Sequence, residues 1–268
     1  MNLQSSLNKK KIALSFSRAA ETYDQFSRLQ KHLANELAQT ISSLNISPKD
    51  ILDIGTGTGE VAFLLHEKFG DARITGCDIA TGMIEKAVQK NRSGNMTFEV
   101  ADAESLPYGD GSFDLVASST TYQWVEHLDT AFAEAGRVLR KPGHFAFITL
   151  GPESLAELKK SFKFTVDETA EYLHEYKTIG EISTLLETCG FKVVRIGSKL
   201  VRTAYSDFKD LFRTIKGIGA LNATTELPKG LRGRSKIRGL IKYYESNYRL
   251  GGSIYATYEI IEAVCIKA

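Results

Sequence analysis

Residues 51–60 constrain this chain more than any other stretch, because they place three glycines at alternate positions directly after an apolar run. Ile51, Leu52 and Ile54, interrupted by Asp53, predict a short buried strand. The glycines at 55, 57 and 59 are incompatible with a regular strand and predict a tight turn, after which residues 61–65 follow a helical pattern. A strand, a glycine turn and a helix in this order open backbone N–H groups to a ligand, since no Cβ atoms stand in the way.

The spacing of these glycines separates the possible ligands. A dinucleotide site has the pattern G-x-G-x-x-G, whereas here the pattern is G-x-G-x-G and Glu60 takes the place of the last glycine. A carboxylate at the start of the helix would repel a pyrophosphate. A P-loop is excluded because no Gly-Lys-Ser/Thr follows. The acid in the strand favours a ligand with a positively charged end, and a purely structural glycine turn is the alternative.

Strand-like and helix-like segments alternate from residue 51 onward, which predicts a parallel sheet with helices on both faces. Residues 191–196, extending toward Tyr205, and residues 254–266 predict two further strands. The last strand follows without a crossover helix, which indicates an antiparallel partner. We therefore expect an α/β, Rossmann-like fold with a seven-stranded, mostly parallel sheet. The other predicted strands are 51–54, 73–78, 96–100, 113–118 and 144–149, and the predicted helices are 12–44, 60–69, 80–90, 127–139, 155–162, 166–176 and 178–189, with a turn at 141–143.

Three acids fall at comparable strand ends, where a parallel sheet forms its binding crevice. Asp53 lies inside the first strand, Asp78 ends the second and Asp102 follows the third. Asp78 lies about twenty residues past the glycine turn, the spacing at which a carboxylate meets ribose hydroxyls. Asp102 and the N–H of Ala103 suit the amino group and a ring nitrogen of adenine, and Ile79 suits its apolar face. Each acid alone is equally compatible with a solvated loop carboxylate, but the ordered set favours a nucleoside.

Composition narrows the class of protein further. The chain has 268 residues, of which 43% are hydrophobic and 25% charged, which is ordinary for a globular protein. A net charge of +2 gives little support for nucleic-acid binding. No apolar run is long enough to span a bilayer and no signal-peptide core is visible, so we expect a cytoplasmic protein without a membrane partner. Cys77, Cys189 and Cys265 are far apart and predict buried thiols, not a metal site or disulfides.

Residues 51–149 resemble the class I S-adenosylmethionine-dependent methyltransferases. The glycine turn matches motif I of that family, and Leu139-Arg140-Lys141-Pro142-Gly143 is similar to its turn before the fifth strand. The resemblance implies a Rossmann-like class I methyltransferase fold, S-adenosyl-L-methionine as cofactor, S-adenosyl-L-homocysteine as its product, and no metal. The cofactor-binding residues that we expect are Asp53, Gly55, Thr56, Gly57, Asp78, Ile79, Asp102, Ala103 and Ser118.

The chain as a whole resembles a narrower family, the malonyl-acyl carrier protein O-methyltransferases of biotin synthesis. This resemblance rests on residues 16–20, 23–24, 30, 118–125, 215–220 and 257–259. It implies that the free carboxylate of a malonyl thioester receives the methyl group. A carboxylate is ionised at pH 7 and needs no general base. We therefore interpret His127 as a helix-start residue, with a base for a hydroxyl or amine acceptor as the alternative. We expect Tyr23, Tyr122 and Gln123 to position the acceptor, and substrate-binding residues among Arg18, Tyr23, Gln123, Trp124, Arg202 and Arg213.

Residues 209–242 are rich in lysine and arginine, and only Asp210 and Glu226 oppose them there. An acidic acyl carrier protein would be steered by such a segment, although a solvated helical face is the alternative. The expected carrier-protein surface is Lys229, Arg232, Arg234, Lys236 and Arg238. The expected single domain comprises an N-terminal helical cap (1–47), a cofactor-binding core (48–150), the second half of the sheet (151–206), a basic helical insertion or lid (207–250) and the final strand (251–268).

Two other functions remain open from the sequence. The same core would serve a methyltransferase for another small carboxylic acid or a quinone-type acceptor. It would also serve a non-catalytic cofactor-binding module. The basic segment contains one aromatic residue, Phe212, and not the repeated aromatic interleaving of nucleic-acid-binding surfaces. We therefore expect no nucleic-acid partner, and we assign no oligomeric state.

Overall fold

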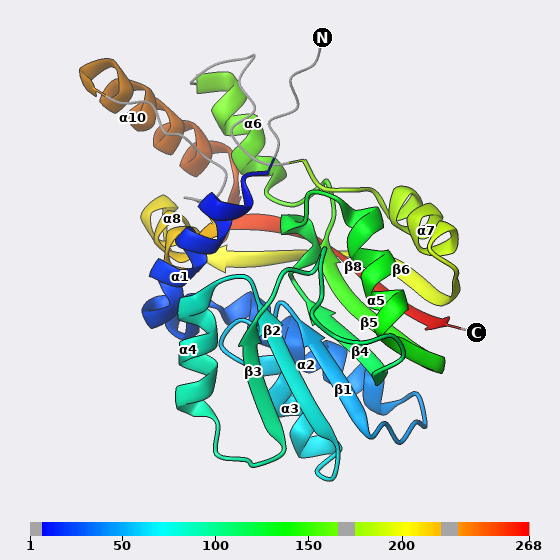
Figure 1. Ribbon diagram of the computed structural model, residues 1–268. Coiled ribbons are helices and arrows are strands. Elements are labelled where there is room, and N and C mark those ends of the chain that lie inside the picture. Colours follow the sequence, from blue (N-terminus) through cyan, green and yellow to red (C-terminus); the bar gives the residue numbers. More distant parts are fainter. Residues whose placement is uncertain (1–6, 166–174, 221–229, 268) are drawn as a thin grey trace.

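The computed structural model describes residues 7–165, 175–220 and 230–267, and it folds around one mixed sheet with the order β3-β2-β1-β4-β5-β8-β6 (Figure 1). The strands β1 to β5 pair in parallel, whereas β8 runs antiparallel to both β5 and β6. The predicted sheet is confirmed, with a two-residue strand, β7, added beside β8. The strands are β1 (Asp50–Ile54), β2 (Arg73–Asp78), β3 (Met96–Val100), β4 (Phe113–Ser119), β5 (Leu139–Leu150), β6 (Phe191–Tyr205), β7 (Arg249–Leu250) and β8 (Ser253–Lys267).

The helices cover both faces of the sheet, as the alternating pattern predicts. On one face, α2 buries Leu33, Leu37 and Ile41, which follow each other at four-residue spacing. On the other face, Phe132 of α5 packs against Phe145 and Phe147 of β5. The helices are α1 (Lys9–Phe26), α2 (Arg28–Ser42), α3 (Glu60–Lys68), α4 (Thr81–Lys90), the 3₁₀ helix η1 (Tyr122–Trp124), α5 (Leu128–Val138), α6 (Ala156–Thr165), α7 (Ile179–Thr188), α8 (Phe208–Gly217) and α10 (Gly230–Asn247).

Three local predictions differ from the structure. The predicted turn at 141–143 lies within β5, because Gly143 pairs with Lys267 of β8, a partner distant in sequence. Of the helix predicted over 166–176, residues 166–174 lie outside the described residues, and Glu175 and Tyr176 are not helical. Cys77 and Cys265 are buried as predicted, but Cys189 follows the end of α7 and is half-exposed.

Helix α1 is held over the sheet by a close contact with the end of α8 (Figure 1). A Cβ atom at Gly217 would overlap the ring of Phe26, so only glycine allows this approach. Gly219 has φ +85°, and its carbonyl accepts a hydrogen bond of 2.7 Å from Oγ of Ser15. The N-terminal helix α1 therefore packs against the segment Gly217-Ile218-Gly219.

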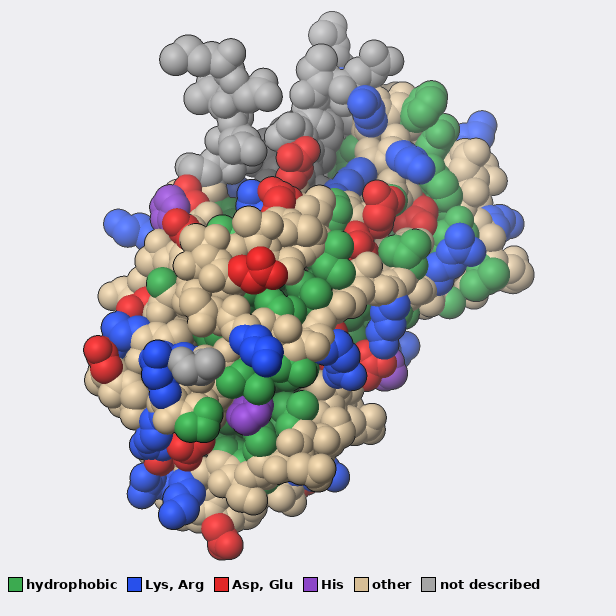
Figure 2. Space-filling view, turned by 90° about the vertical axis from the view of Figure 1, so that its right-hand side faces the viewer, with side chains coloured by type: hydrophobic (Ala, Val, Ile, Leu, Met, Phe, Trp, Pro, Cys, Tyr) green, Lys and Arg blue, Asp and Glu red, His purple; other side chains and the backbone are tan. Residues whose placement is uncertain are grey.

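The surface carries charges of both signs. On the face drawn in Figure 2, lysine and arginine side chains are interspersed with acids, and hydrophobic side chains show only in small groups. Among the described residues, no helix combines the length and the apolar character that a membrane span requires.

Candidate functional site

The glycine turn between β1 and α3 forms the floor of the candidate site. Gly55, Gly57 and Gly59 have φ angles of +68°, +56° and +92°, which L side chains rarely adopt. A Cβ atom at Gly57 would meet nothing within 4 Å, so the turn exposes its backbone to open space there. The N–H of Gly57 donates to Oδ2 of Asp78 over 3.0 Å, which ties the turn to the end of β2.

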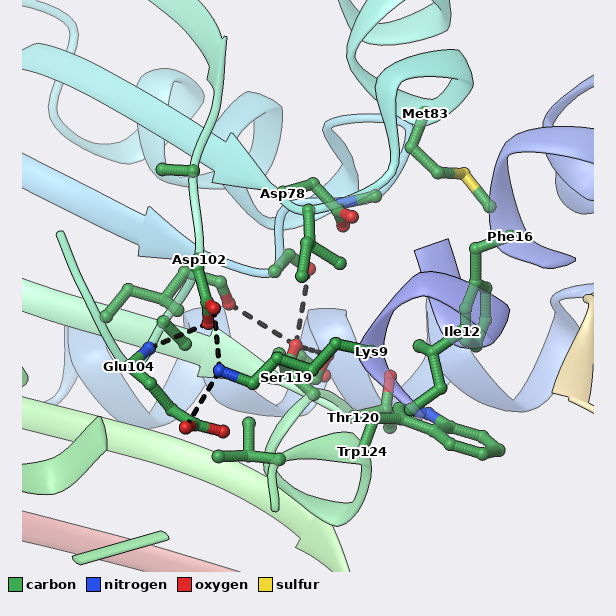
Figure 3. A pocket seen from close by; sticks show the side chains of 18 of the residues that line it. Lys9, Ile12, Phe16, Asp78, Met83, Asp102, Glu104, Ser119, Thr120 and Trp124 are labelled. Atoms are coloured by element: carbon green, nitrogen blue, oxygen red, sulfur yellow. Dashed lines mark hydrogen bonds and ion pairs between the residues drawn. The ribbon is translucent and has the colours of Figure 1, made fainter. Parts of the chain in front are cut away.

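A cavity of about 740 Å³ opens above this turn, at the carboxyl ends of β1, β2 and β4 (Figure 3). Helix α1 forms its opposite wall. We name it the nucleoside cavity, after the ligand that the sequence predicts for this edge of the sheet. It is lined by Lys9, Ile12, Phe16, Tyr23, Ile54, Gly55, Gly57, Asp78, Ile79, Met83, Ala101, Asp102, Ala103, Glu104, Ser119, Thr120, Thr121, Trp124 and Val125.

Asp78 and Asp102 both line this cavity. Oδ1 of Asp78 accepts from the N–H of Ala80 over 2.8 Å, and burial raises the pKa of this carboxyl to about 6 despite its two backbone donors. Asp102 accepts from the N–H of Glu104 over 3.0 Å and from Nζ of Lys9 over 2.7 Å. The two carboxylates thus stand on one wall, oriented by backbone N–H groups.

Three of the predicted cofactor residues lie behind this wall. Asp53 is 0% exposed beneath the turn, where Oδ2 accepts from Oγ1 of Thr56 over 2.6 Å, and burial raises the pKa of Asp53 to about 7. Ser118 is also fully buried and donates to the carbonyl of Ile54 over 2.8 Å. These residues support the turn, whereas Gly55, Gly57, Asp78, Ile79, Asp102 and Ala103 line the nucleoside cavity itself.

Two further cavities adjoin the first. One, of about 380 Å³, lies between the glycine turn and the start of α2. The other, of about 690 Å³, lies between α1, η1, α8, β6 and β8. We name it the acceptor cavity, because several of the residues predicted to bind the acceptor line it. Tyr23 and Thr120 line all three cavities and therefore stand at their junction. Thr120 has φ +55°, a strained conformation for a β-branched residue of the kind that recurs at functional sites.

The acceptor cavity is largely apolar and contains one charged residue among its described lining residues, Arg28. The hydroxyls of Tyr205 and Tyr258 lie 2.9 Å apart in its wall. Burial raises the pKa of Tyr205, and the bond to Tyr258 and the nearby charge of Arg28 oppose that rise only in part. Burial likewise raises the pKa values of Tyr23 and Tyr258. These tyrosines stay protonated at neutral pH and act as hydrogen-bond donors, not as bases.

Tyr23, Gln123 and Trp124, three of the predicted acceptor residues, line the acceptor cavity. The amide of Gln123 is fixed, because Nε2 donates to the carbonyl of Thr120 over 2.7 Å and Oε1 accepts from Oγ1 of Thr149 over 3.0 Å. The ring of Trp124 packs edge-on against Phe16 of α1 at 5.3 Å.

The other predicted acceptor residues lie elsewhere. Tyr122 is 3% exposed and packs among the phenylalanines on the opposite face of the sheet. Arg18, Arg202 and Arg213 do not line the acceptor cavity, whereas Arg28, which is exposed like them, does. On β6, Thr203 and Tyr205 face the cavity, so the alternation of the strand turns Arg202 away, where it lies 4.8 Å from the ring of Tyr255.

Three residues that line the site are not among the site residues predicted from the sequence. Arg28 follows the break between α1 and α2, Thr120 follows β4, and Lys9 begins α1. Thr120 was foreseeable, because it falls two residues past Ser118 at a strand end. Nothing local distinguishes Arg28 from Arg18 or Lys9 from Lys10, because only the packing of α1 and α2 decides which of these side chains lines a cavity.

The predicted carrier-protein surface falls partly within the described structure. Lys236 and Arg238 are exposed on α10, which extends away from the sheet beside α6 (Figure 1). Arg232 and Arg234 belong to α10, but their side chains are outside the described part, and Lys229 lies outside the described residues altogether. His127 caps the start of α5, as predicted. No group of three or more His, Cys, Asp or Glu side chains in the described ranges is placed to hold a metal ion.

Comparisons with known proteins support a methyltransferase. A family model described as a methyltransferase domain matches residues 52–147. The chain is 34% identical over 263 residues to the malonyl-[acyl-carrier protein] O-methyltransferase of Geobacter sulfurreducens, covering 96% of this chain and 98% of that protein. The corresponding protein of Hahella chejuensis is 34% identical over 260 residues, covering 97% and 90%. The biotin biosynthesis bifunctional protein BioHC of Teredinibacter turnerae is 34% identical over 265 residues, covering 95% of this chain and 46% of that protein.

Solved structures share the fold. The geranyl diphosphate C-methyltransferase of Streptomyces coelicolor, determined with S-adenosyl-L-homocysteine, matches with a TM-score of 0.55 at 16% identity, covering 90% of this chain and 80% of that one. An S-adenosylmethionine-dependent methyltransferase of Mesorhizobium loti matches with a TM-score of 0.53 at 18% identity, covering 87% and 97%.

Proposed function

This chain belongs to the malonyl-[acyl-carrier protein] O-methyltransferase family, and from that premise we propose that it methylates the free carboxylate of a malonyl thioester on an acyl carrier protein, in biotin synthesis, with S-adenosyl-L-methionine as the methyl donor. One observation carries the proposal. Tyr23 and Thr120 join a cavity suited to a nucleoside to a second cavity, whose described lining residues include one cation and no base.

The nucleoside cavity fits the proposed cofactor. Its wall offers Asp78 for ribose hydroxyls and Asp102 with Ala103 for adenine, while Gly57 leaves backbone space over the turn. Oγ of Ser119, which also lines the cavity, has no hydrogen-bond partner among the described residues and offers a further polar contact. When bound, the cofactor supplies an electrophilic methyl group.

The acceptor cavity favours a carboxylate over other nucleophiles. Its described lining contains no His, Asp, Glu or Lys, and its tyrosines have raised pKa values, so no side chain there removes a proton at neutral pH. A hydroxyl or amine acceptor needs such a base, whereas a carboxylate is already ionised. The work of the protein is then to orient the carboxylate and exclude water.

We assign Arg28, in place of the arginines expected from the sequence, to the recognition of the acceptor carboxylate. It supplies the positive charge of the cavity, and the joined hydroxyls of Tyr205 and Tyr258 supply a donor beside it. Of the two protons of this hydroxyl pair, one is used between them and one is left for a ligand. A planar guanidinium also suits a carboxylate, which it can meet with two parallel hydrogen bonds.

For the carrier protein, we propose α10 as the docking surface. Lys236, Arg238 and Lys242 are exposed along this helix, and in the sequence Lys229, Arg232 and Arg234, which were also predicted, extend the same basic segment. An acidic carrier protein would be attracted by these charges before its thioester enters the cavity.

The test of this function is a methyl-transfer assay with purified protein, S-adenosyl-L-methionine and malonyl-acyl carrier protein. We expect methyl ester formation, and no ester from acetyl-acyl carrier protein, which has no free carboxylate. A protein that binds the cofactor but leaves malonyl thioesters unchanged would defeat the proposal. Activity with another small carboxylic acid or a quinone instead would identify the alternative function.

A paired charge reversal tests the docking surface separately. We expect Arg238→Glu with Lys242→Glu to raise KM for malonyl-acyl carrier protein several-fold and to leave KM for malonyl-pantetheine unchanged. Lys68→Glu on α3, an exposed lysine at the end of another helix, is the matched control. Equal effects of the paired and control substitutions would rule out α10 as the docking surface.

A further inference from the structure

Lys9, the first residue of α1, reaches across the nucleoside cavity to two acids (Figure 3). Its Nζ lies 2.7 Å from Oδ2 of Asp102 and 2.8 Å from Oε2 of Glu104. The helix begins firmly at this point, because Oδ1 of Asn8 accepts from the N–H of Lys11 over 3.0 Å. One ammonium group therefore connects the start of α1 to the loop that follows β3.

The two acids need this cation. The side chain of Glu104 is only 7% exposed, and its other oxygen accepts from the N–H groups of Glu126 and His127 over 3.2 Å each. A nearly buried carboxylate is costly without a partner of opposite charge. Lys9 is the only cation among the described lining residues of the cavity. Burial lowers the pKa of Lys9, but the hydrogen bonds to both acids outweigh this effect and raise it, so the ammonium stays charged.

The ion pairs also fix the apolar wall of the cavity. Lys9, Ile12 and Phe16 follow at spacings of three and four residues, so they share one face of α1, and all three line the cavity. Phe16 in turn packs against Trp124 at the border of the acceptor cavity. Releasing Lys9 would free the end of α1 that covers the side of the cavity proposed for adenine.

We propose that Lys9 is a positioning residue of the cofactor site, which holds α1 closed over the adenine through Asp102 and Glu104 and so slows cofactor release. The inference rests on the proposed function, because the adenine position follows from it. Lys9 also holds Asp102 in the orientation that an adenine amino group requires. A purely electrostatic role makes the opposite prediction, since removing a cation from an acidic cavity would strengthen the binding of a positively charged sulfonium.

The experiment compares Lys9→Gln and Lys9→Arg with the unsubstituted chain. The rate of S-adenosyl-L-homocysteine release is measured by stopped-flow displacement, and the affinities of this compound and of S-adenosyl-L-methionine by calorimetry. We expect Lys9→Gln to accelerate release and weaken both affinities roughly tenfold, the scale of one charged hydrogen bond, and Lys9→Arg to restore most of the loss.

Lys86→Gln provides the matched control. Nζ of Lys86 lies 2.6 Å from Oε2 of Glu21, so this ion pair also fastens α1 to the body of the protein but lies outside the cavity lining. We expect the Lys86→Gln variant to release S-adenosyl-L-homocysteine at the same rate as the unsubstituted chain.

The outcomes separate this inference from the proposed function. An unchanged release rate in Lys9→Gln, tighter binding of S-adenosyl-L-methionine, or an equal effect of Lys86→Gln would overturn the role of Lys9 while the cofactor assignment stands. Failure of the unsubstituted chain to bind either compound would overturn the cofactor assignment and this inference with it.

Discussion

The nucleoside cavity and the acceptor cavity meet at Tyr23 and Thr120, yet they are built in different ways. The floor of the first comes from consecutive strand ends of one parallel sheet, and its charged lining consists of three acids and Lys9. The second collects side chains from α1, α2, η1, β6, α8 and β8, and within the part of the chain that the structure describes its lining carries a single charge, on Arg28. The first cavity is therefore suited to a ligand with hydroxyl, amino and cationic groups, and the second to an anion.

The two cavities also differ in which part of the molecule forms them: the first depends on the shared methyltransferase fold, and the second on a segment between two strands. Solved methyltransferases with 16% and 18% identity keep the fold that forms the first cavity. The second cavity depends on the packing of α1 against Gly217 and Gly219, which lie in the insertion between β6 and β8. Substitutions in one cavity should accordingly leave the binding function of the other intact.

Asp78→Ala should give the largest effect, and only on the nucleoside side. Losing the carboxylate that we propose accepts two ribose hydrogen bonds should weaken S-adenosyl-L-homocysteine binding by about 100-fold or more, since each charged bond contributes roughly 1.5–3 kcal/mol. Calorimetry measures the change, with Asp71→Ala, an exposed acid outside the lining of either cavity, as control. Undiminished affinity would show that the ligand lies elsewhere.

Arg28→Gln should weaken recognition of the acceptor and leave cofactor binding unaffected. We expect the KM for malonyl-pantetheine to rise about 10- to 100-fold, because one charged hydrogen-bond donor is lost, while cofactor affinity stays unchanged. Arg18→Gln, on the exposed face of α1, controls for loss of a neighbouring positive charge. If both variants behaved alike, the acceptor carboxylate would have another partner.

The pH dependence of cofactor binding should follow the acids of the first cavity. Burial raises the pKa of Asp78 to about 6, so the side chain that we propose accepts ribose hydrogen bonds is a carboxylate above this pH and is protonated below it. S-adenosyl-L-homocysteine affinity should therefore fall about tenfold per unit as pH drops below about 6. In the Asp78→Asn variant, the affinity should no longer fall as the pH drops below about 6. If the affinity of this variant still changed near pH 7, the change would point to Asp53, whose pKa burial raises to about 7.

Gly217→Ala should give the smallest effect. It tests whether the packing of α1 against α8 matters for the acceptor cavity and not for the nucleoside cavity. The added methyl group meets the Phe26 ring, and overpacking of this kind costs about 1–3 kcal/mol of unfolding free energy. We expect lower thermal stability and a higher KM for malonyl-pantetheine, with cofactor affinity nearly unchanged. Gly180→Ala in α7, where a Cβ atom meets nothing within 4 Å, should instead be neutral or slightly stabilising.

The sequence by itself determined the parallel sheet, the glycine turn and the acids of the nucleoside cavity, because these depend on hydrophobic period and on residues within a few positions of one another. Asp78 and Asp102 could be assigned to one edge from their places at strand ends alone, and the structure puts both in one cavity. Asp53 and Ser118 also belong to this edge, but the side chains of both point beneath the turn.

Only the tertiary structure decided which cations line the two cavities. Arg28 and Lys9 were not foreseen and Arg18, Arg202 and Arg213 were expected in their place, because a helix or an edge strand presents its charged side chains to either side until its packing is known. The docking of α1 against α8 and the pairing of β6 with β8 fix that orientation over separations of about two hundred residues and about sixty residues. Contacts of that kind leave no periodic signal in the chain, so they become visible only once the molecule is folded.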